Sequence, residues 1–535
     1  LNHNFSNSVS LSVFGLQQIT HEADANYNPV NRYVGGSYQL DRTIRTLVLN
    51  NTYILSPSTV LTVRGGYNKF DDNYVLPYDY DAKALFNNAA LTSQFSDTNR
   101  FPTTAVTGYK GSGWTNRQAN GYYQYGVNGS LSKLSGHHSY KFGGDYRVLG
   151  VKSLNYGAAT GSFTFDGKWS GNALADLLLG YPTSGNIPLN GQLNGFVHYS
   201  AGYAQDDWRV NDKLTLNYGV RFDYNKQRIV GQKAQQGRFA NIAAYNDIDL
   251  PTWSNFSPRL SAVYNLSGDG KTAVRIGYNK FVTAQTTGFA QLYNPTALVT
   301  QQLAWTDVNG DDIAQGERGC VGYPTAGCEI NFAGLPSNFG VRSLAQFDPG
   351  LKRPYQLAFN AGITHEVLNG LTLSFEYFRS DFRNVTVRQN TLRTAASYDQ
   401  VTVVSPLNGK EVPMWLPKPG VASQVANVDS TSDDMKRWYN GFDMSFNARL
   451  KGGLRAFGGY SIERSLNDVC VSAASDPNRS LYCDQTKSGI PWQKQFKTTF
   501  VYPVKWQNIS VSMALQSLNG YVVGSAAQAY GGFTA

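Results

Sequence analysis

Residues 214–224 read LTLNYGVRFDY, and the alternation in this stretch decides the fold. Its even-numbered positions carry leucine, tyrosine, valine and phenylalanine, whereas its odd-numbered positions carry threonine, asparagine, glycine, arginine and aspartate. Side chains of a β-strand alternate between two faces, so the pattern predicts a strand with one apolar and one polar face. The same alternation recurs at residues 371–377, 509–516 and 140–148. The chain is therefore predicted to be an all-β protein.

The composition agrees with this and excludes two other classes of protein. Aromatic residues make up 13% of the 535 residues and charged residues only 16%, against about 25% charged in a typical soluble domain. The mean hydropathy is −0.35 and apolar runs stay far shorter than the ~18 residues of a transmembrane helix, which excludes a helical membrane protein. A chain so rich in aromatic residues can bury a large surface, which excludes disorder.

Tight turns and long connections alternate along the whole chain. We expect seven hairpins, and their turns are centred on Ser56-Pro57, Ser135-Gly136, Asn211-Asp212, Gly268-Asp269-Gly270, Leu368-Asn369, Lys451-Gly452 and Lys505-Trp506. The connections between them span 18–40, 71–118, 152–194, 226–254, 283–352, 382–436 and 466–491. One further strand, around residues 8–16, has no expected upstream partner. This alternation is typical of outer-membrane β-barrels, with short periplasmic turns and long extracellular loops.

The expected strands run to roughly 12–15 residues, more than the 9–11 that cross a bilayer. A β-sandwich has shorter strands, and a propeller would show a regular blade repeat. Trp208 and Trp506 lie beside short turns and Trp438 opens a strand at the long-loop end, as in the two aromatic girdles of a barrel. The sequence thus predicts a transmembrane antiparallel β-barrel whose outer face contacts the lipid of the outer membrane.

Charged residues of the expected strands are predicted to face the lumen. A charge that faced lipid at mid-bilayer would cost about 2–4 kcal/mol for arginine or lysine. A charged inner wall suits a water-filled channel or a folded plug, although for any one residue such charges can simply satisfy each other. The residues concerned are Arg64, Asp145, Arg147, Arg221, Asp223, Arg275 and Glu376.

The four cysteines fall into two local pairs, Cys320 with Cys328 and Cys470 with Cys483. Because there is no CxxC motif and no neighbouring histidine, we expect two disulfides and not a metal site. Disulfides indicate an oxidising compartment such as the periplasm or the cell surface.

Residues 307–317, DVNGDDIAQGE, resemble the start of a calcium loop. Oxygen ligands at alternate positions could surround Ca²⁺, which prefers such hard ligands. The loop departs from the EF-hand pattern because the carboxylate falls one place early and position twelve is Arg318. An Asx-rich turn held by the neighbouring cysteine bridge is the alternative. The candidate ligands are Asp307, Asn309, Asp311, the carbonyl of Ile313, and Glu317.

Other functions find little support in the sequence. The net charge is +9 and the isoelectric point is about 9.1, but the basic residues are scattered, which disfavours nucleic acid as a partner. There is no GxSxG motif, and the His21-Glu22 and His365-Glu366 pairs lack the second histidine of a zincin helix. We therefore expect no enzymatic activity.

Four stretches carry a family resemblance. Residues 203–223, YAQDDWRVNDKLTLNYGVRFD, resemble a hallmark hairpin of TonB-dependent outer-membrane receptors. Together with 171–180 (GNALADLLLG), 255–260 (NFSPRL) and 305–307 (WTD), they resemble the Oar-like subfamily, large receptors with an N-terminal carboxypeptidase-regulatory-like domain. The resemblance covers the whole chain in pattern and these stretches in detail.

The resemblance implies a barrel of about 22 strands that is plugged by an N-terminal domain and energised by TonB-ExbB-ExbD. We expect residues 1–535 to be a barrel portion of about 15 such strands, with the plug, the carboxypeptidase-regulatory-like domain and the last strands outside this sequence. The implied function is import of a ligand captured by extracellular loops. That ligand could be an oligosaccharide, a peptide or a metal chelate.

Loop tryptophans are the candidate ligand contacts, because their rings could stack on sugars or flat chelates. Trp114, Trp305 and Trp415 are the candidates, and each could equally pack a loop against itself. The alternative functions are a structural or adhesive outer-membrane protein, a secretion-linked Oar-like channel, and a passive porin. Long loops stapled by disulfides argue against an open general pore.

Overall fold

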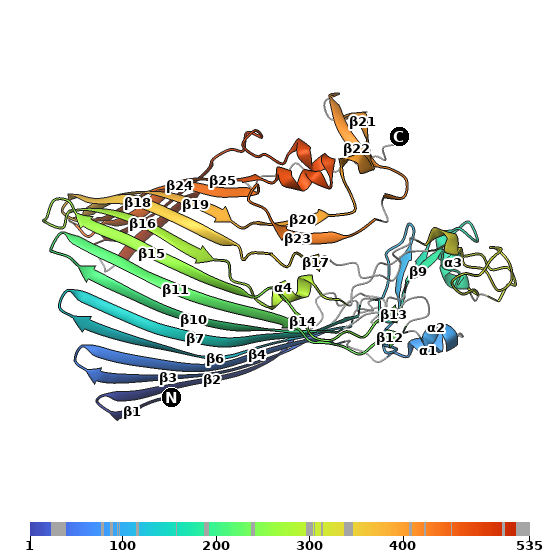
Figure 1. Cartoon of the computed structure of the whole chain (residues 1–535), viewed down its shortest axis with the longest axis horizontal. Coiled ribbons are helices and arrows are strands. Elements are labelled where there is room, and N and C mark those ends of the chain that lie inside the picture. The colour runs from blue at the N-terminus through green and yellow to red at the C-terminus, as the bar shows by residue number, and fades with distance from the viewer. Residues whose placement is uncertain are drawn as a thin grey trace.

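The computed structural model is dominated by one sheet of 17 strands that lie side by side across the molecule (Figure 1). None of the helices among the described residues is long and apolar enough to cross a membrane. The structure describes residues 1–22, 39–75, 80–85, 89–93, 95, 97–113, 117–156, 158–186, 192–236, 241–295, 303, 305–311, 314–335, 346–405, 409–421, 424–450, 452–504 and 509–519.

Long strands make up nearly all of this sheet, and the short strand β14 (Ile248–Asp249) adds to it beside β11. The long strands are β1 (Asn2–Ser6), β2 (Val9–Glu22), β3 (Gln39–Ser56), β4 (Thr59–Val75), β6 (Arg117–Ser135), β7 (His138–Tyr156), β10 (Gln192–Arg209), β11 (Leu214–Ile229), β15 (Trp253–Asn265), β16 (Thr272–Val282), β18 (Tyr355–Leu368), β19 (Leu371–Arg383), β24 (Lys436–Arg449), β25 (Arg455–Asp468), β26 (Gln493–Val504) and β27 (Ile509–Ser517).

These strands form an antiparallel meander in chain order, since each long strand pairs with the one before and the one after it. Among the described residues, β1 pairs only with β2 and β27 only with β26. The tight turns gather at one end of the sheet and the long connections at the other (Figure 1). Six of the seven predicted tight turns lie where the sequence placed them, and the seventh, at Lys505-Trp506, falls outside the described residues. The fold class is confirmed.

Two sequence predictions about the strands were wrong in detail. The strand near residues 8–16 has an upstream partner, because β1 turns at Asn7-Ser8 and pairs back onto β2. Five residues are too few to show a periodic pattern. The strands β6 and β7 reach 19 residues, beyond the predicted length. The backbone hydrogen bonds between strands continue beyond the residues with alternating apolar side chains. The strand ends found there are polar, and at one of them Arg42 Nε on β3 lies 2.8 Å from Asp72 Oδ1 on β4.

The two faces of the sheet differ as the alternation predicts. On β11 the even-numbered side chains from Leu214 to Tyr224 are aliphatic or aromatic, and two of them are exposed, Tyr218 at 42% and Val220 at 45%. The odd-numbered Asp223, Asn225 and Gln227 on the opposite face are almost completely buried. Because an apolar exposed face suits the hydrocarbon of a membrane, we assign the even face of β11 to lipid and the odd face to the interior.

Close approach by tyrosine rings requires glycine at two cross-strand positions. Tyr123 lies directly opposite Gly150, and a Cβ at Gly150 would sit 1.9 Å from the tyrosine ring. Tyr203 covers Gly143 in the same way at 2.5 Å. An aromatic ring laid over a strand glycine restores the packing that the missing side chain leaves open.

The long connections contain their own small elements (Figure 1). The helices are α1 (Ala82–Leu85), α2 (Ala89–Thr92), α3 (Ala173–Leu179) and α4 (Thr287–Leu292), with 3₁₀ turns at Phe332–Gly334, Ala395–Ser397, Cys470–Ala474 and Pro477–Leu481. The strands are β5 (Thr103–Val106), β8 (Ser162–Phe165), β9 (Ser184–Asn186), β12 (Gln235–Gln236), β13 (Asn241–Ile242), β17 (Gln346–Phe347), β20 (Thr386–Asn390), β21 (Tyr398–Val404), β22 (Glu411–Pro417) and β23 (Asn427–Thr431).

The assignment of the faces can be tested on β11. We expect Val220→Lys to lower the free energy of unfolding by about 2–4 kcal/mol, because it places an ammonium in lipid. Asn217→Lys on the interior face is the matched control and should cost clearly less. Denaturant titration of the protein folded into lipid vesicles measures both. Equal losses for the two variants would contradict the assignment.

Candidate functional site in the sheet interior and outer loops

The ladder register brings the seven charged residues singled out from the sequence onto one face. Arg64, Asp145 and Asp223 lie in one row across the sheet, through Asn128 and Ala201. Arg147 lies two residues after Asp145 and Arg221 lies two residues before Asp223, so both share that face. The same register places Arg275 and Glu376 there through Val263 and Gly362. This is the interior face.

Most of these charges are paired within the wall. Arg147 Nη2 lies 2.5 Å from Asp145 Oδ2, and Arg221 Nε lies 2.9 Å from Asp223 Oδ1. Arg275 pairs with Glu376 across Gly362, and a Cβ at Gly362 would come within 2.7 Å of the Glu376 side chain.

Arg64 Nε donates to Asn50 Oδ1 at 2.8 Å instead of to an acid. All four predicted inner-face arginines therefore have a polar partner on a strand of the sheet.

A cavity of about 210 Å³ opens on this face toward the long-loop end. Its wall comes from β7, β10, β11, β15 and β16, and its roof comes from residues 284–286 and Arg353. A second cavity of about 410 Å³ shares Arg221 and Arg259 with the first and is lined by residues nearer the tight turns. The two cavities adjoin at these shared arginines and form one hollow along the interior face.

The roof of the first cavity is fixed by α4 and the segment before β18. Phe289 and Tyr293 pack with Trp253 in a buried apolar cluster, and the indole nitrogen of Trp253 donates to the Leu351 carbonyl at 2.8 Å. Arg353 Nε donates to the Thr283 carbonyl at 2.9 Å. These contacts join residues far apart in the sequence into one cover over the interior face.

The buried carboxylate of Asp429 on β23 ties this cover to the next loop. The Tyr293 hydroxyl donates to Asp429 Oδ2 at 2.9 Å, and Arg388 on β20 donates through Nε and Nη2 at 2.7 and 2.8 Å. Burial, together with the bond to Asp429, raises the pKa of Tyr293, so its hydroxyl stays a donor at neutral pH.

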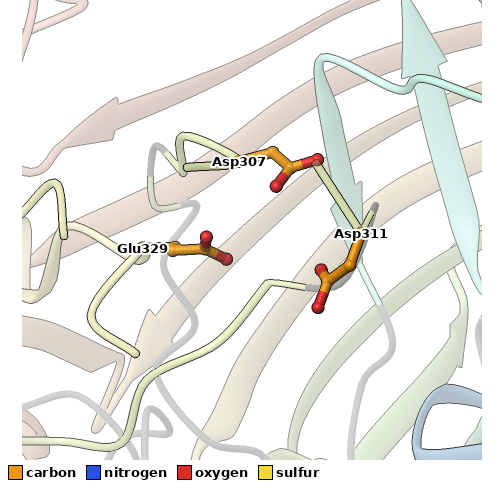
Figure 2. A group of neighbouring side chains, drawn as sticks. All are labelled: Asp307, Asp311 and Glu329. Carbon is orange, nitrogen blue, oxygen red and sulfur yellow. The ribbon is translucent and has the colours of Figure 1, made fainter. Parts of the chain in front are cut away.

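An acidic group lies in the outer loop between β16 and β18. Asp307, Asp311 and Glu329 bring one carboxylate oxygen each within 4.8 Å of one another (Figure 2). Glu329 is fully buried and accepts from the backbone nitrogens of Val308 at 2.8 Å and Gln315 at 3.1 Å. It thereby holds the two sides of the loop together.

This group differs from the calcium set predicted from the sequence. Asn309 lies beside Asp311 and donates to its Oδ2 at 2.9 Å, but Glu317 is not in the carboxylate group and Ile313 lies outside the described residues. Sequence reasoning missed Glu329, which follows Cys328 directly. The signal was an acid flanked by Cys328 and Ile330, since such a position becomes buried once the bridge closes.

Both cysteine pairs are disulfide-bonded, Cys320 with Cys328 and Cys470 with Cys483. The second bridge closes the loop that carries Asn478. The Asn478 side chain bonds the backbone nitrogen and carbonyl of Trp415, each at 2.8 Å.

The predicted contact tryptophans belong to separate loops. The ring of Trp305 lies 6.4 Å from that of Trp169, in the loop that carries α3. Trp415 belongs to β22 instead, and Trp114 lies outside the described residues. The structure does not gather the tryptophans into one site within the part of the chain it describes.

The girdle tryptophans also have defined neighbours. Trp208 stacks on His138 beside a tight turn with ring centres 5.3 Å apart. The Arg379 guanidinium lies 5.9 Å from the ring centre of Trp438, near the start of β24. Trp506 lies outside the described residues.

A buried carboxylate organises the loop of α3. Asp176 Oδ1 accepts from the nitrogen and hydroxyl of Ser170 at 2.8 and 2.6 Å, and Oδ2 accepts from the nitrogen of Trp169 at 3.3 Å. Burial alone would raise the pKa of Asp176, but these hydrogen bonds outweigh it and lower the pKa below its ordinary value. The carboxylate therefore stays ionised at neutral pH.

The chain matches the family model described as outer membrane beta barrel domain over residues 1–535, and it belongs to that family. This places it in the outer membrane. A comparison with curated protein sequences found no match.

Among solved structures, the chain is similar to the outer membrane transporter YddB from Escherichia coli, with 10% identity and a TM-score of 0.50 over 94% of this chain and 53% of YddB. It is also similar to the FrpB iron transporter (F5-1 variant) from Neisseria meningitidis, with 12% identity and a TM-score of 0.49 over 96% and 58% of the two chains. The alcaligin outer membrane receptor FauA from Bordetella pertussis shares 10% identity with the chain, with a TM-score of 0.47 over 96% of this chain and 58% of FauA. The chain thus spans just over half of these structures. The likeness to YddB concerns the fold alone.

The role of Asp176 can be tested by hydrogen exchange. Because its pKa is lower in the folded loop, its stabilising effect is complete above the ordinary value of 3.8 and is lost as the pH falls through the folded value. We expect residues 169–176 to keep their protection down to about pH 4 and lose it below, and Asp176→Asn to reduce it at neutral pH. Asp212→Asn, at an exposed tight turn, is the control. Unchanged protection in Asp176→Asn would contradict this role.

Proposed function

We propose that this outer-membrane barrel chain belongs to a TonB-dependent transporter of the Oar-like subfamily, which captures a ligand at its outer loops and imports it through the barrel. In this proposal the chain works with an N-terminal plug domain and with TonB-ExbB-ExbD. The protein is a carrier and not an enzyme.

The observation that carries the proposal is the pairing of a polar interior face with folded outer loops. Cavities line the interior face on either side of Arg221 and Arg259. The outer loops hold their shape through two disulfides, the buried Asp429 and the buried Glu329. An open general pore does not require loops that fold over its interior face in this way. Residues 203–223 resemble a hairpin of TonB-dependent receptors, and this resemblance is the reason for including TonB in the proposal.

Uptake measurements test this proposal. We expect a strain that lacks the gene to lose uptake of one class among labelled oligosaccharides, peptides and metal chelates, and a strain that lacks TonB to lose the same uptake. The intact gene should restore it in the first strain only.

Two other results would contradict transport of this kind. Uptake that persists without TonB would indicate a passive pore. Surface binding that depends on the gene without any uptake would indicate an adhesive protein.

We also propose that the outer loop with Asp307, Asp311 and Glu329 binds Ca²⁺. Three carboxylates and the Asn309 side-chain oxygen are hard ligands of the kind that Ca²⁺ prefers. A bound ion would offset the repulsion among these carboxylates and stiffen the loop. An Asx turn held by the disulfide bridge is the competing explanation.

Limited proteolysis of this loop tests the calcium proposal. We expect Ca²⁺ to slow cleavage between residues 305 and 335 in the wild type and to have no effect in the double variant Asp307→Asn/Asp311→Asn. Glu317→Gln removes a neighbouring carboxylate outside the group and should keep the effect of Ca²⁺. Cleavage that ignores Ca²⁺ in the wild type would favour the Asx turn.

A further inference from the structure

The first interior cavity has an excess of positive charge. Arg147 and Arg221 are balanced by Asp145 and Asp223, but Arg259 and Arg353 have no carboxylate partner among the described residues. The Arg259 guanidinium lies 4.9 Å from the ring centre of Phe281, which leaves its hydrogen-bond donors unused by that contact. Two uncompensated guanidinium groups therefore border one cavity.

Lys280 also lines this cavity, but its side chain lies on the opposite face of the sheet, so its ammonium group does not face the cavity. The register of β16 puts Lys280 on the face opposite to Asn279 and Phe281. Its ammonium lies 4.4 Å from the ring centre of Tyr355. The excess charge thus comes from the arginines alone.

Arg353 is the residue that most needs a partner. The residue is almost completely buried, with a relative exposure of 3%, and its Nη1 has no hydrogen-bond partner in the part of the chain that the structure describes. Ser257, which lines the same cavity, is also buried, and its hydroxyl lacks a partner there too. A buried donor without an acceptor costs about 1–3 kcal/mol, and more when it is charged. A ligand that accepts from both groups would recover that cost.

The charged groups near Arg353 also support an anionic ligand for this residue. Burial lowers the pKa of its guanidinium, Asp223 raises it, and Arg221 lowers it, so Arg353 lies within the electrostatic reach of the wall charges. Arginine stays protonated in proteins even so. A permanent, desolvated guanidinium with Nη1 still unpartnered suits a carboxylate or phosphate oxygen as its acceptor.

We propose that this cavity is a binding site for an oxyanion, namely a phosphate or carboxylate group of a small solute, held by Arg353, Arg259 and Ser257. The volume of about 210 Å³ admits such a group but is below the ~300 Å³ of a pocket that encloses a drug-sized ligand. The remainder of a larger ligand would extend into the adjoining cavity of about 410 Å³ past Arg221. The proposal deepens the proposed transport function, because it names the chemistry of the solute that crosses the interior.

Calorimetric titration of the full-length protein in detergent tests it, with inorganic phosphate and succinate as the two probes at low ionic strength. We expect at least one probe to bind, and its affinity to fall about tenfold or more in Arg353→Gln, since a hydrogen bond to a charged group is lost. Arg259→Gln should weaken binding as well. Arg64→Gln removes the same charge from the same face outside the cavity and should bind like the wild type.

The conservative variant Arg353→Lys guards against misfolding. It should fold like the wild type by circular dichroism and bind more weakly, because an ammonium does not reproduce the planar fork. Binding of phosphate alone or succinate alone identifies the oxyanion. Binding of neither probe, or equal affinity in Arg353→Gln and Arg64→Gln, would overturn the proposal.

This result is independent of the transport test, because titration requires neither TonB nor uptake. If uptake depends on TonB and neither probe binds, the oxyanion site fails and transport stands. If a probe binds through Arg353 and no uptake occurs, the site stands and the transport function fails.

Discussion

The pairing of every backbone amide and carbonyl inside the membrane is the constraint on which the rest of this structure depends. Hydrocarbon offers no hydrogen-bond partner, so each unpaired group there costs several kcal/mol. The meander pairs these groups between each strand and its neighbours, whereas the outer edges of β1 and β27 have no partner among the described residues. Once the ladders are in register, the period of two decides which side chains meet lipid. The charges at Asp145, Arg147, Arg221 and Asp223 then have to face the interior.

Because neighbours in the sheet are neighbours in the sequence, much of the fold could be predicted without a structure. The alternation in residues 214–224 gave the faces of β11, and the tight-turn residues gave the ends of the hairpins. The short β1 escaped because five residues carry too little periodicity. The longest strands were underestimated because their outer ends lose the apolar alternation while the backbone ladder continues.

The site was predictable only where it follows from the sheet. The inner-face charges follow from periodicity, whereas Arg353, Tyr293 and Asp429 meet through contacts between distant loops. No local pattern marks Arg353 as buried, since it lies just outside a strand beside Lys352. Glu329 did carry a local signal in its neighbours Cys328 and Ile330, but that signal does not reveal which groups the carboxylate binds. Its role depends on a loop that folds back to present the nitrogens of Val308 and Gln315.

The contrast between tight turns and long loops has a consequence for how the chain folds and how it can change. Two residues, 136–137, connect β6 to β7, so that hairpin forms from local contacts. Joining β16 to β18 must instead close residues 283–354, which makes it a slower, entropically costlier step. That cost grows only with the logarithm of loop length, about 0.6 kcal/mol per doubling. Outer loops can therefore lengthen or shorten over evolutionary time at little cost to stability, while the tight turns cannot.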